Sequence, residues 1–141
     1  MACVNDTASC LPAVLLQGGL LGAVSATAVL SSTTASAGQL TGASIVIFWH
    51  AGGTNPGTYT TRTAVQMIND TTPPMQTSQT WLLFLGNQNG TGTLTLAGGT
   101  GVTIGGTTTV AANVGRFYLC TVTAATTITM TGQALSVTVA A

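Results

Sequence analysis

The chain has 141 residues, enough for one domain that buries about two thirds of the surface its unfolded chain exposes. Only 3% of the residues are charged, against about 25% in an ordinary soluble domain, and the net charge is zero. Nucleic-acid binding needs several Lys or Arg side chains and a membrane-surface protein needs a basic face, so we expect neither partner.

So few charges leave little electrostatic repulsion to oppose self-association. Apolar residues make up 45% of the chain and tend to alternate with polar ones, which excludes a disordered body. We therefore expect an ordered protein, much of whose surface meets other protein. The charged residues are Asp6, Arg62, Asp70 and Arg116.

Residues 11–30 carry no charge, so a signal peptide and a membrane-spanning helix are the first structures to consider. A secretory signal begins with positive charge, whereas Asp6 is the one charged residue before this stretch. Pro12 and Gly18 interrupt a spanning helix, and no Lys or Arg flanks it. We therefore expect neither a cleaved signal nor a membrane span.

The first part of the chain is instead expected to form β-structure. Two short apolar strands are predicted near residues 13–16 and 21–30, with a Gly-Gly turn between them. Residues 31–38 then read as a loop. The chain thus divides into an apolar N-terminal arm or strand pair, residues 1–38, and a β-sandwich domain, residues 39–141.

In the second part, short apolar runs alternate with turn residues, which is typical of an all-β protein. Residues 43–50 and 80–85 are the strongest strand candidates, because they are β-branched, aromatic or aliphatic at nearly every position. With no helix between the later strands, we expect a largely antiparallel β-sandwich or jelly-roll-like barrel. The apolar residues expected at every second position of these strands are Leu94, Leu96, Val102, Ile104, Phe117, Leu119, Ile128, Met130, Leu135, Val137 and Val139.

Residues 60–74 hold the one helical candidate. Thr61 or Thr63 can cap the start of the helix, and two consecutive prolines end it. We expect one short helix of about two turns, packed on a sheet by Val65 and Ile68.

The run "GGTGVTIGG" at residues 98–106 raises the question of a phosphate-binding loop. It lacks the G-x-G-x-x-G spacing, no lysine follows it and it leads into no helix. We interpret its first glycines as the tight connection between strands near residues 94–96 and 102–104. In the same way, "NQNG" at residues 87–90 predicts a hairpin turn.

No combination of side chains supports catalysis. His50, Asp6 and Asp70 are the candidates for acid–base chemistry, and no motif relates them. Cys3, Cys10 and Cys120 lack the spacing of a zinc site. We expect no enzyme activity, no cofactor and no metal, with the cysteines as free buried thiols or the first two as a disulfide.

Arg62 and Arg116 are candidates for assembly. A guanidinium can pair with a carboxylate such as Asp70, with backbone carbonyls or with a neighbouring subunit, and a plain surface position is the alternative. Most aromatic residues are expected in the core, but apolar side chains occupy both faces of residues 43–50 and 80–85, so one face is a candidate intersubunit surface. The aromatic interface candidates are Phe48, Trp49, Trp81 and Tyr59.

The stretch from "TRTAVQMIND" to "TITMTG" resembles a Thr/Gly-rich β-domain of virion structural proteins in tailed phages and large DNA viruses. The resemblance covers about residues 39–132, and its most specific part is "GTGVTI", a threonine run, "VAAN" and Arg116-Phe117. It implies a capsid cement, decoration or spike protein without enzymatic activity, often a trimer. The implied partners are the major capsid protein and further copies of the chain, on a capsid surface assembled in the host cytoplasm.

Two other functions stay open. A viral fibre, spike or adhesin domain would bind host glycans through polar uncharged loops with aromatic residues such as Tyr59. An ice-binding protein is suggested by alternating threonines in "TLT", "TVT" and "TITMT", although the spacing between these pairs is irregular.

Overall fold

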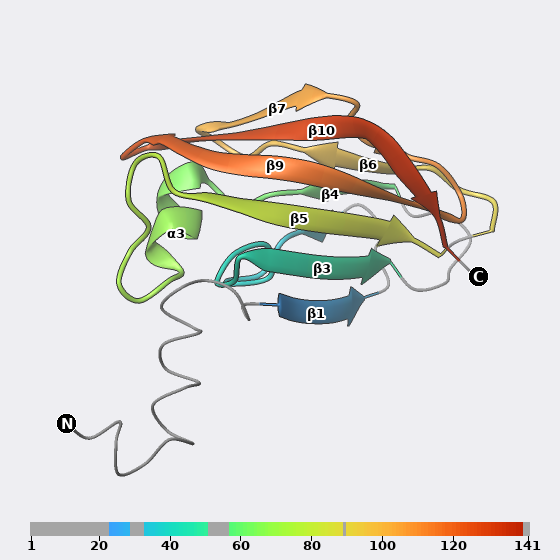
Figure 1. Cartoon of the computed structure of the whole chain (residues 1–141), viewed down its shortest axis with the longest axis horizontal. Helices are drawn as coiled ribbons and strands as arrows, with labels where there is room; N and C mark the ends of the chain where they lie inside the picture. Colours follow the sequence, from blue (N-terminus) through green and yellow to red (C-terminus); the bar gives the residue numbers. More distant parts are fainter. Residues whose placement is uncertain (1–22, 29–32, 51–56, 89, 140–141) are drawn as a thin grey trace, which may run out of the picture.

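The structure is a computed structural model that describes residues 23–28, 33–50, 57–88 and 90–139. Most of these residues lie in β-strands, and one short helix accompanies them (Figure 1). The elements are β1 (Ala23–Ala28), β2 (Thr33–Thr34), β3 (Ile45–His50), β4 (Thr58–Thr60), α3 (Ala64–Asn69), β5 (Thr80–Asn87), β6 (Leu94–Ala97), β7 (Val102–Gly106), β8 (Thr109–Val110), β9 (Val114–Ala124) and β10 (Thr127–Thr138).

The strands form two sheets between which the chain alternates. The larger sheet has the order β1-β3-β5-β9-β10-β7, and the smaller sheet has the order β2-β4-β6-β8. β1, β3 and β5 run parallel, as do β2, β4 and β6. The first six strands therefore wind as a two-sheet coil, in which each turn adds one strand to each sheet.

This topology confirms the two strongest strand predictions and a mostly β chain, but it corrects the expected strand directions. Among the described strands, five pairings are parallel and three are antiparallel. Parallel neighbours need a crossover, and here a strand of the other sheet serves as the crossover in place of a helix. β5 and β6 lie in different sheets, so the hairpin predicted at residues 87–90 is not formed between them. In the described part neither sheet closes on itself, so a barrel is not formed.

The described residues of the predicted N-terminal arm belong to the same two sheets. β1 lies within the strand predicted at residues 21–30 and pairs with β3. β2 lies within the predicted loop at residues 31–38 and pairs with β4. The strand predicted at residues 13–16 falls outside the described residues.

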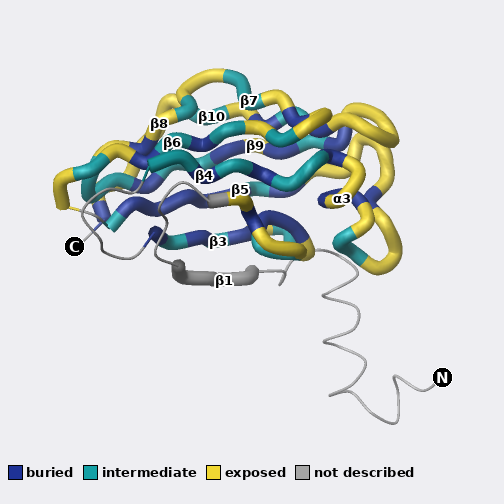
Figure 2. Tube along the Cα trace, turned by 180° about the vertical axis from the view of Figure 1, so that it is seen from behind, coloured by how far each residue is buried: buried dark blue, intermediate teal, exposed yellow. Residues whose placement is uncertain are grey.

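The core lies between the two sheets. The ring of Phe48 in β3 stacks on that of Tyr59 in β4, with 4.9 Å between centroids and 12° between planes. Figure 2 shows buried residues along the strands, with exposed residues gathered in the loops. The largest fully buried aliphatic side chains of the strands are Leu83, Leu85, Leu94, Leu96, Ile128, Met130 and Val46.

The alternation predicted for the later strands has the right period, but in β9 it has the wrong face. Tyr118 and Cys120 are fully buried, whereas Leu119 is 43% exposed and Phe117 is half-buried. The core face of β9 therefore carries the residues that were expected to face away from it. Leu135 and Val137 of β10 are also exposed.

α3 covers one end of the two sheets (Figure 1). Thr63 is the N-cap, and it forms a capping box with Gln66. The predicted helix and its cap are confirmed, but Val65 is 45% exposed and does not pack on a sheet as expected. It lies outside the i, i+3, i+4 stripe that faces the core. The buried residues of α3 are Ala64, Met67 and Ile68.

Met67 and Val65 therefore offer a matched pair for testing this helix face. We expect Met67→Ala to lower the free energy of unfolding by about 2–5 kcal/mol, because it leaves a cavity in the core. Val65→Ala should change it by about 0.5 kcal/mol or less. Urea unfolding followed by circular dichroism measures both. Equal effects of the two substitutions would contradict the assigned face.

Candidate functional site

Arg62 and Asp70 form an ion pair that brackets α3. Arg62 precedes the helix and Asp70 is its C-cap, and the Arg62 Nη1 group donates to Asp70 Oδ1. Asp70 Oδ2 accepts the backbone N–H of Gly38 at 3.1 Å. The two side chains are 22% and 11% exposed. The predicted pairing is confirmed, and it ties the helix to the segment that leads into β3.

Arg116 binds backbone carbonyls rather than an acid. Its Nη1 group donates to the carbonyl oxygen of Gln133 at 2.7 Å, and its Nε group donates to that of Thr109 at 3.3 Å. The first of these carbonyls lies where the β9–β10 register shifts, between Gly132 and Ser136. Such irregularities leave backbone groups without ladder partners. Arg116 thus supports the irregular part of β10 from within the chain.

The glycine run after β6 packs against the start of α3. The N–H of Gly99 donates to Thr61 Oγ1 at 2.8 Å, and the N–H of Ala64 donates to the carbonyl of Thr100 at 2.9 Å. A Cβ on Gly99 would lie 2.6 Å from the carbonyl oxygens of Thr61 and Arg62. The run is therefore a close-packed connection, as predicted, although it joins strands of different sheets.

Three of the aromatic interface candidates lie inside the protein. Phe48 and Tyr59 are fully buried, and Trp81 is 5% exposed. Tyr59 donates its hydroxyl to Gln39 Oε1 at 2.8 Å, and Trp81 donates its indole N–H to the carbonyl of Leu40 at 2.8 Å. Their burial corrects the expectation that these side chains contact a partner or a glycan. They fill the core because the contacts between the two sheets take up the inner faces of β3, β4 and β5.

Trp49, the fourth candidate, lies on the side of the larger sheet that faces away from the smaller one. Its ring meets that of Phe84 edge-on at 5.2 Å, and the Phe84 ring meets that of Phe117 at 4.8 Å. A Cβ on Gly86 would lie 2.2 Å from the Trp49 ring, and one on Gly115 would lie 2.1 Å from the Phe84 ring. Because the two glycines have no side chains, the rings of Trp49 and Phe84 can pack directly against the backbone of the sheet.

These rings belong to a larger apolar surface, which we call the outer face. The strand register places Ile45, Leu82 and Leu119 side by side on β3, β5 and β9. Ile45 and Leu119 are 41% and 43% exposed. The sequence indicated this face on two strands and missed its extension to β9, whose apolar residues were assigned to the core. The outer face comprises Ile45, Ile47, Trp49, Leu82, Phe84, Phe117, Leu119 and Val137.

A row of threonines borders the outer face. Thr80, Thr121, Thr129 and Thr103 are register partners on β5, β9, β10 and β7. The next row is apolar across β3, β5 and β9 and continues into Thr131 on β10, the register partner of Leu119. The broad array of threonines that ice binding needs therefore does not extend over β3 and β5.

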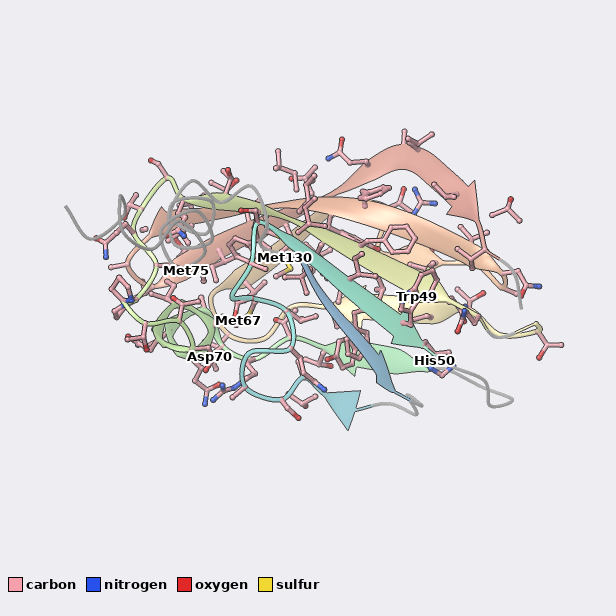
Figure 3. All side chains as sticks on the ribbon, turned by 60° about the horizontal axis from the view of Figure 1, so that its bottom comes forward. Trp49, His50, Met67, Asp70, Met75 and Met130 are labelled. Carbon is pink, nitrogen blue, oxygen red and sulfur yellow. The ribbon has the colours of Figure 1, made fainter. Side chains whose placement is uncertain are left out.

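A cavity of about 650 Å³ opens near α3, between the segment before β3 and the loop that leads into β5. Figure 3 places Asp70 and Met75 at this end of the molecule, with Trp49 and His50 at the other. The walls are mostly neutral, and they include Gln76, Gln79 and Trp81. The sequence contained no signal for this cavity, because loops far apart in the chain enclose it.

The remaining titratable groups of the described part lie in the core. His50 is fully buried, and Cys120 is a buried free thiol. Burial raises the pKa of the Cys120 thiol, which opposes its use as a nucleophile. No cluster of three potential metal ligands occurs in the described ranges, and none of their helices is long and apolar enough to cross a membrane. Cys3 and Cys10 lie outside these ranges.

Comparison of the chain with protein-family models, with curated proteins and with solved structures finds no match. The resemblance to virion β-domains therefore stays a prediction that rests on residues 39–132. The function has to follow from the surfaces and contacts described above.

Gly99 and Gly90 allow a test of the close packing at the glycine run. We expect Gly99→Ala to lower the free energy of unfolding by about 1–3 kcal/mol, because the new Cβ meets backbone carbonyls that cannot move aside easily. Gly90→Ala should change it by about 0.5 kcal/mol or less, since a Cβ there has no atom within 4 Å. Thermal or urea unfolding compares the two variants, and similar losses would contradict this role of Gly99.

Tyr118 predicts how stability depends on alkaline pH. Burial raises its pKa to about 12, whereas an exposed tyrosine titrates near pH 10. The unfolded chain therefore ionises first, and stability should fall as the pH rises from about 10 to about 12. Tyr118→Phe should reduce this fall. The remainder comes in part from Tyr59 and Cys120, whose pKa values burial also raises.

The same variant has a control at neutral pH. The buried Tyr118 hydroxyl has no hydrogen-bond partner among the described residues, so Tyr118→Phe should keep the stability within about 1 kcal/mol at pH 8. Urea unfolding of both proteins at several pH values gives the comparison. A large loss at pH 8, or an unchanged alkaline fall, would refute the assignment.

Proposed function

We propose that the chain is a structural protein of a virion, a capsid cement or decoration protein that binds neighbouring capsid subunits and further copies of itself. The outer face of the larger sheet is the observation that carries this proposal. It is a continuous apolar surface across β3, β5 and β9, on which Ile45 and Leu119 are exposed and Phe84 is 8% exposed between neighbouring rings. Contiguous apolar patches of this kind mark interaction sites.

The use of charge supports assembly over chemistry in solution. Arg62 and Asp70 bind each other, and Arg116 binds carbonyls of its own chain. In the described residues no other charged side chain remains to attract an ionic substrate or a phosphate backbone. A partner is therefore recognised through apolar and hydroxyl contacts, which suits a permanent position between uncharged protein surfaces.

The frame behind the outer face supports a static binding role. Each of its strands has bonded neighbours in the larger sheet, and the opposite side of that sheet packs on the core. The aromatic rings are seated over Gly86 and Gly115 before any partner binds. A preorganised surface of this kind loses little conformational entropy on association.

The cavity near α3 favours a second function, a fibre or adhesin domain that binds a glycan. Its volume of about 650 Å³ and its amide and hydroxyl lining suit an uncharged sugar. Tyr59, the residue first considered for this role, is buried and does not contribute. Assembly is the first choice because the outer face is the larger feature and cannot be explained by a sugar in the cavity.

The location and copy number of the protein on particles test the proposal. Quantitative mass spectrometry and electron cryomicroscopy of virions from the source of the sequence should find the chain in a fixed ratio to the major capsid protein. Its absence from the shell, or a few copies at a tail tip, would exclude a cement role. Glycan-array binding that Gln79→Ala abolishes, without shell occupancy, would favour the second function.

A further inference from the structure

We infer that the outer face joins two copies of this chain, packed face to face about a two-fold axis. The inference deepens the proposed function and rests on its premise that the chain assembles with itself. It adds the surface, the partner and the symmetry of the contact. Four properties of the outer face lead to it, namely its continuity, its low relief, its area and its lack of charge.

The apolar side chains of the outer face are continuous. Ile45, Leu82 and Leu119 are register partners on three adjacent strands. The next row toward the other end of these strands contains Phe84 and Phe117, which are also register partners. Scattered apolar residues on a surface need no explanation, but two neighbouring rows across three strands form one patch. Burial of such a patch against a second apolar surface is favourable, because it removes apolar area from water.

The rings of the outer face also lie close to the sheet. The side chains of Trp49 and Phe84 extend over Gly86 and Gly115, where a Cβ would fall about 2 Å from ring atoms. Gly86 and Gly115 are themselves register partners, so the rings fill one shallow depression in the sheet. A sheet surface with low side-chain relief suits a second such surface, as in face-to-face packing of sheets about 10 Å apart.

The area of the outer face approaches what a dimer contact needs when its border is included. Strands about 4.8 Å apart that rise about 3.3 Å per residue give a projected area on the order of 400 Å² for β3, β5, β9 and β10 over the length of β3. Side-chain relief and the bordering threonine row raise the accessible area toward the ~800 Å² that each partner buries in a stable complex. A second copy supplies the same area on the other side.

The absence of charge selects the partner. None of the outer-face residues is charged, and Arg116 on β9 directs its guanidinium to carbonyls of the chain itself. A charged partner would have to bury charges without a counterpart. A second copy brings an uncharged apolar surface of equal size and produces no such burial. A surface that binds itself forms an isologous contact, which closes at two copies rather than at the three that the resemblance implies.

Leu119→Arg and Val65→Arg test the contact as a matched pair. Both residues are aliphatic and similarly exposed, at 43% and 45%, but Leu119 lies within the outer face and Val65 lies on α3. By light scattering coupled to gel filtration, the wild type and Val65→Arg should have twice the mass of one chain. Leu119→Arg should have the mass of one chain, with a dissociation constant raised at least about 100-fold by the buried charge.

Folding is checked separately. Leu119→Arg should keep the circular dichroism spectrum and the melting temperature of Val65→Arg, compared at concentrations where both are monomers. Should it fail to fold, Ile45→Arg, at a position 41% exposed on β3, replaces it with the same expected result. A dimer that survives a correctly folded outer-face variant overturns the inference.

The mass of the wild type decides the remaining outcomes. A trimer, or a monomer at all concentrations up to about 100 μM, overturns the inference, whether residues 1–22 or another protein then cover the outer face. A monomer that still occupies particles in a fixed ratio would leave the proposed function standing. A dimer that Leu119→Arg splits, but that is absent from particles, would support the inference and contradict the proposed function.

Discussion

The contact between the inner faces of the two sheets sets the rest of the structure. Each strand from β3 to β6 buries alternate side chains against the other sheet, and the stacked rings of Phe48 and Tyr59 show how directly the sheets meet. Because the chain crosses from sheet to sheet after each strand, neighbours in one sheet come from successive turns and run parallel. The parallel order, the missing hairpin and the position of α3 at one end of the coil all follow from this alternation.

The same arrangement leaves the outer face of the larger sheet without a second sheet packed on it among the described residues. The smaller sheet, whose described strands are short, covers only the inner side of the larger one. Side chains on the outer side still recur at every second position, and apart from the bordering threonines those on β3, β5 and β9 are apolar. Parallel sheets are ordinarily covered on both faces. In the larger sheet three of the five pairings are parallel, and the apolar outer side therefore resembles that of a sheet buried on both faces.

Local features were predictable from the sequence, and connections between sheets were not. The helix, its Thr63 cap and the tight connection at Gly99 depend on neighbouring residues, and the structure has them as expected. A crossing to another sheet and a hairpin need the same turn residues. The sequence therefore could not show whether neighbouring strands run parallel or antiparallel. In β9 both faces are apolar, and the period of two does not say whether Phe117 or Tyr118 points inward. The burial of Tyr118 without a hydroxyl partner runs against the usual preference.

The scarcity of charge connects the interior to the outer face. Arg62 and Asp70 hold the ends of α3, and Arg116 supports the irregular part of β10, so each described charge serves the fold. Threonine hydroxyls, which bind water without adding charge, occupy part of the remaining surface. An apolar face can close only where it buries no charge that lacks a partner. The low number of charged residues therefore has two effects. It leaves the free chain with little electrostatic repulsion, and it allows the outer face to be buried without burying a charge.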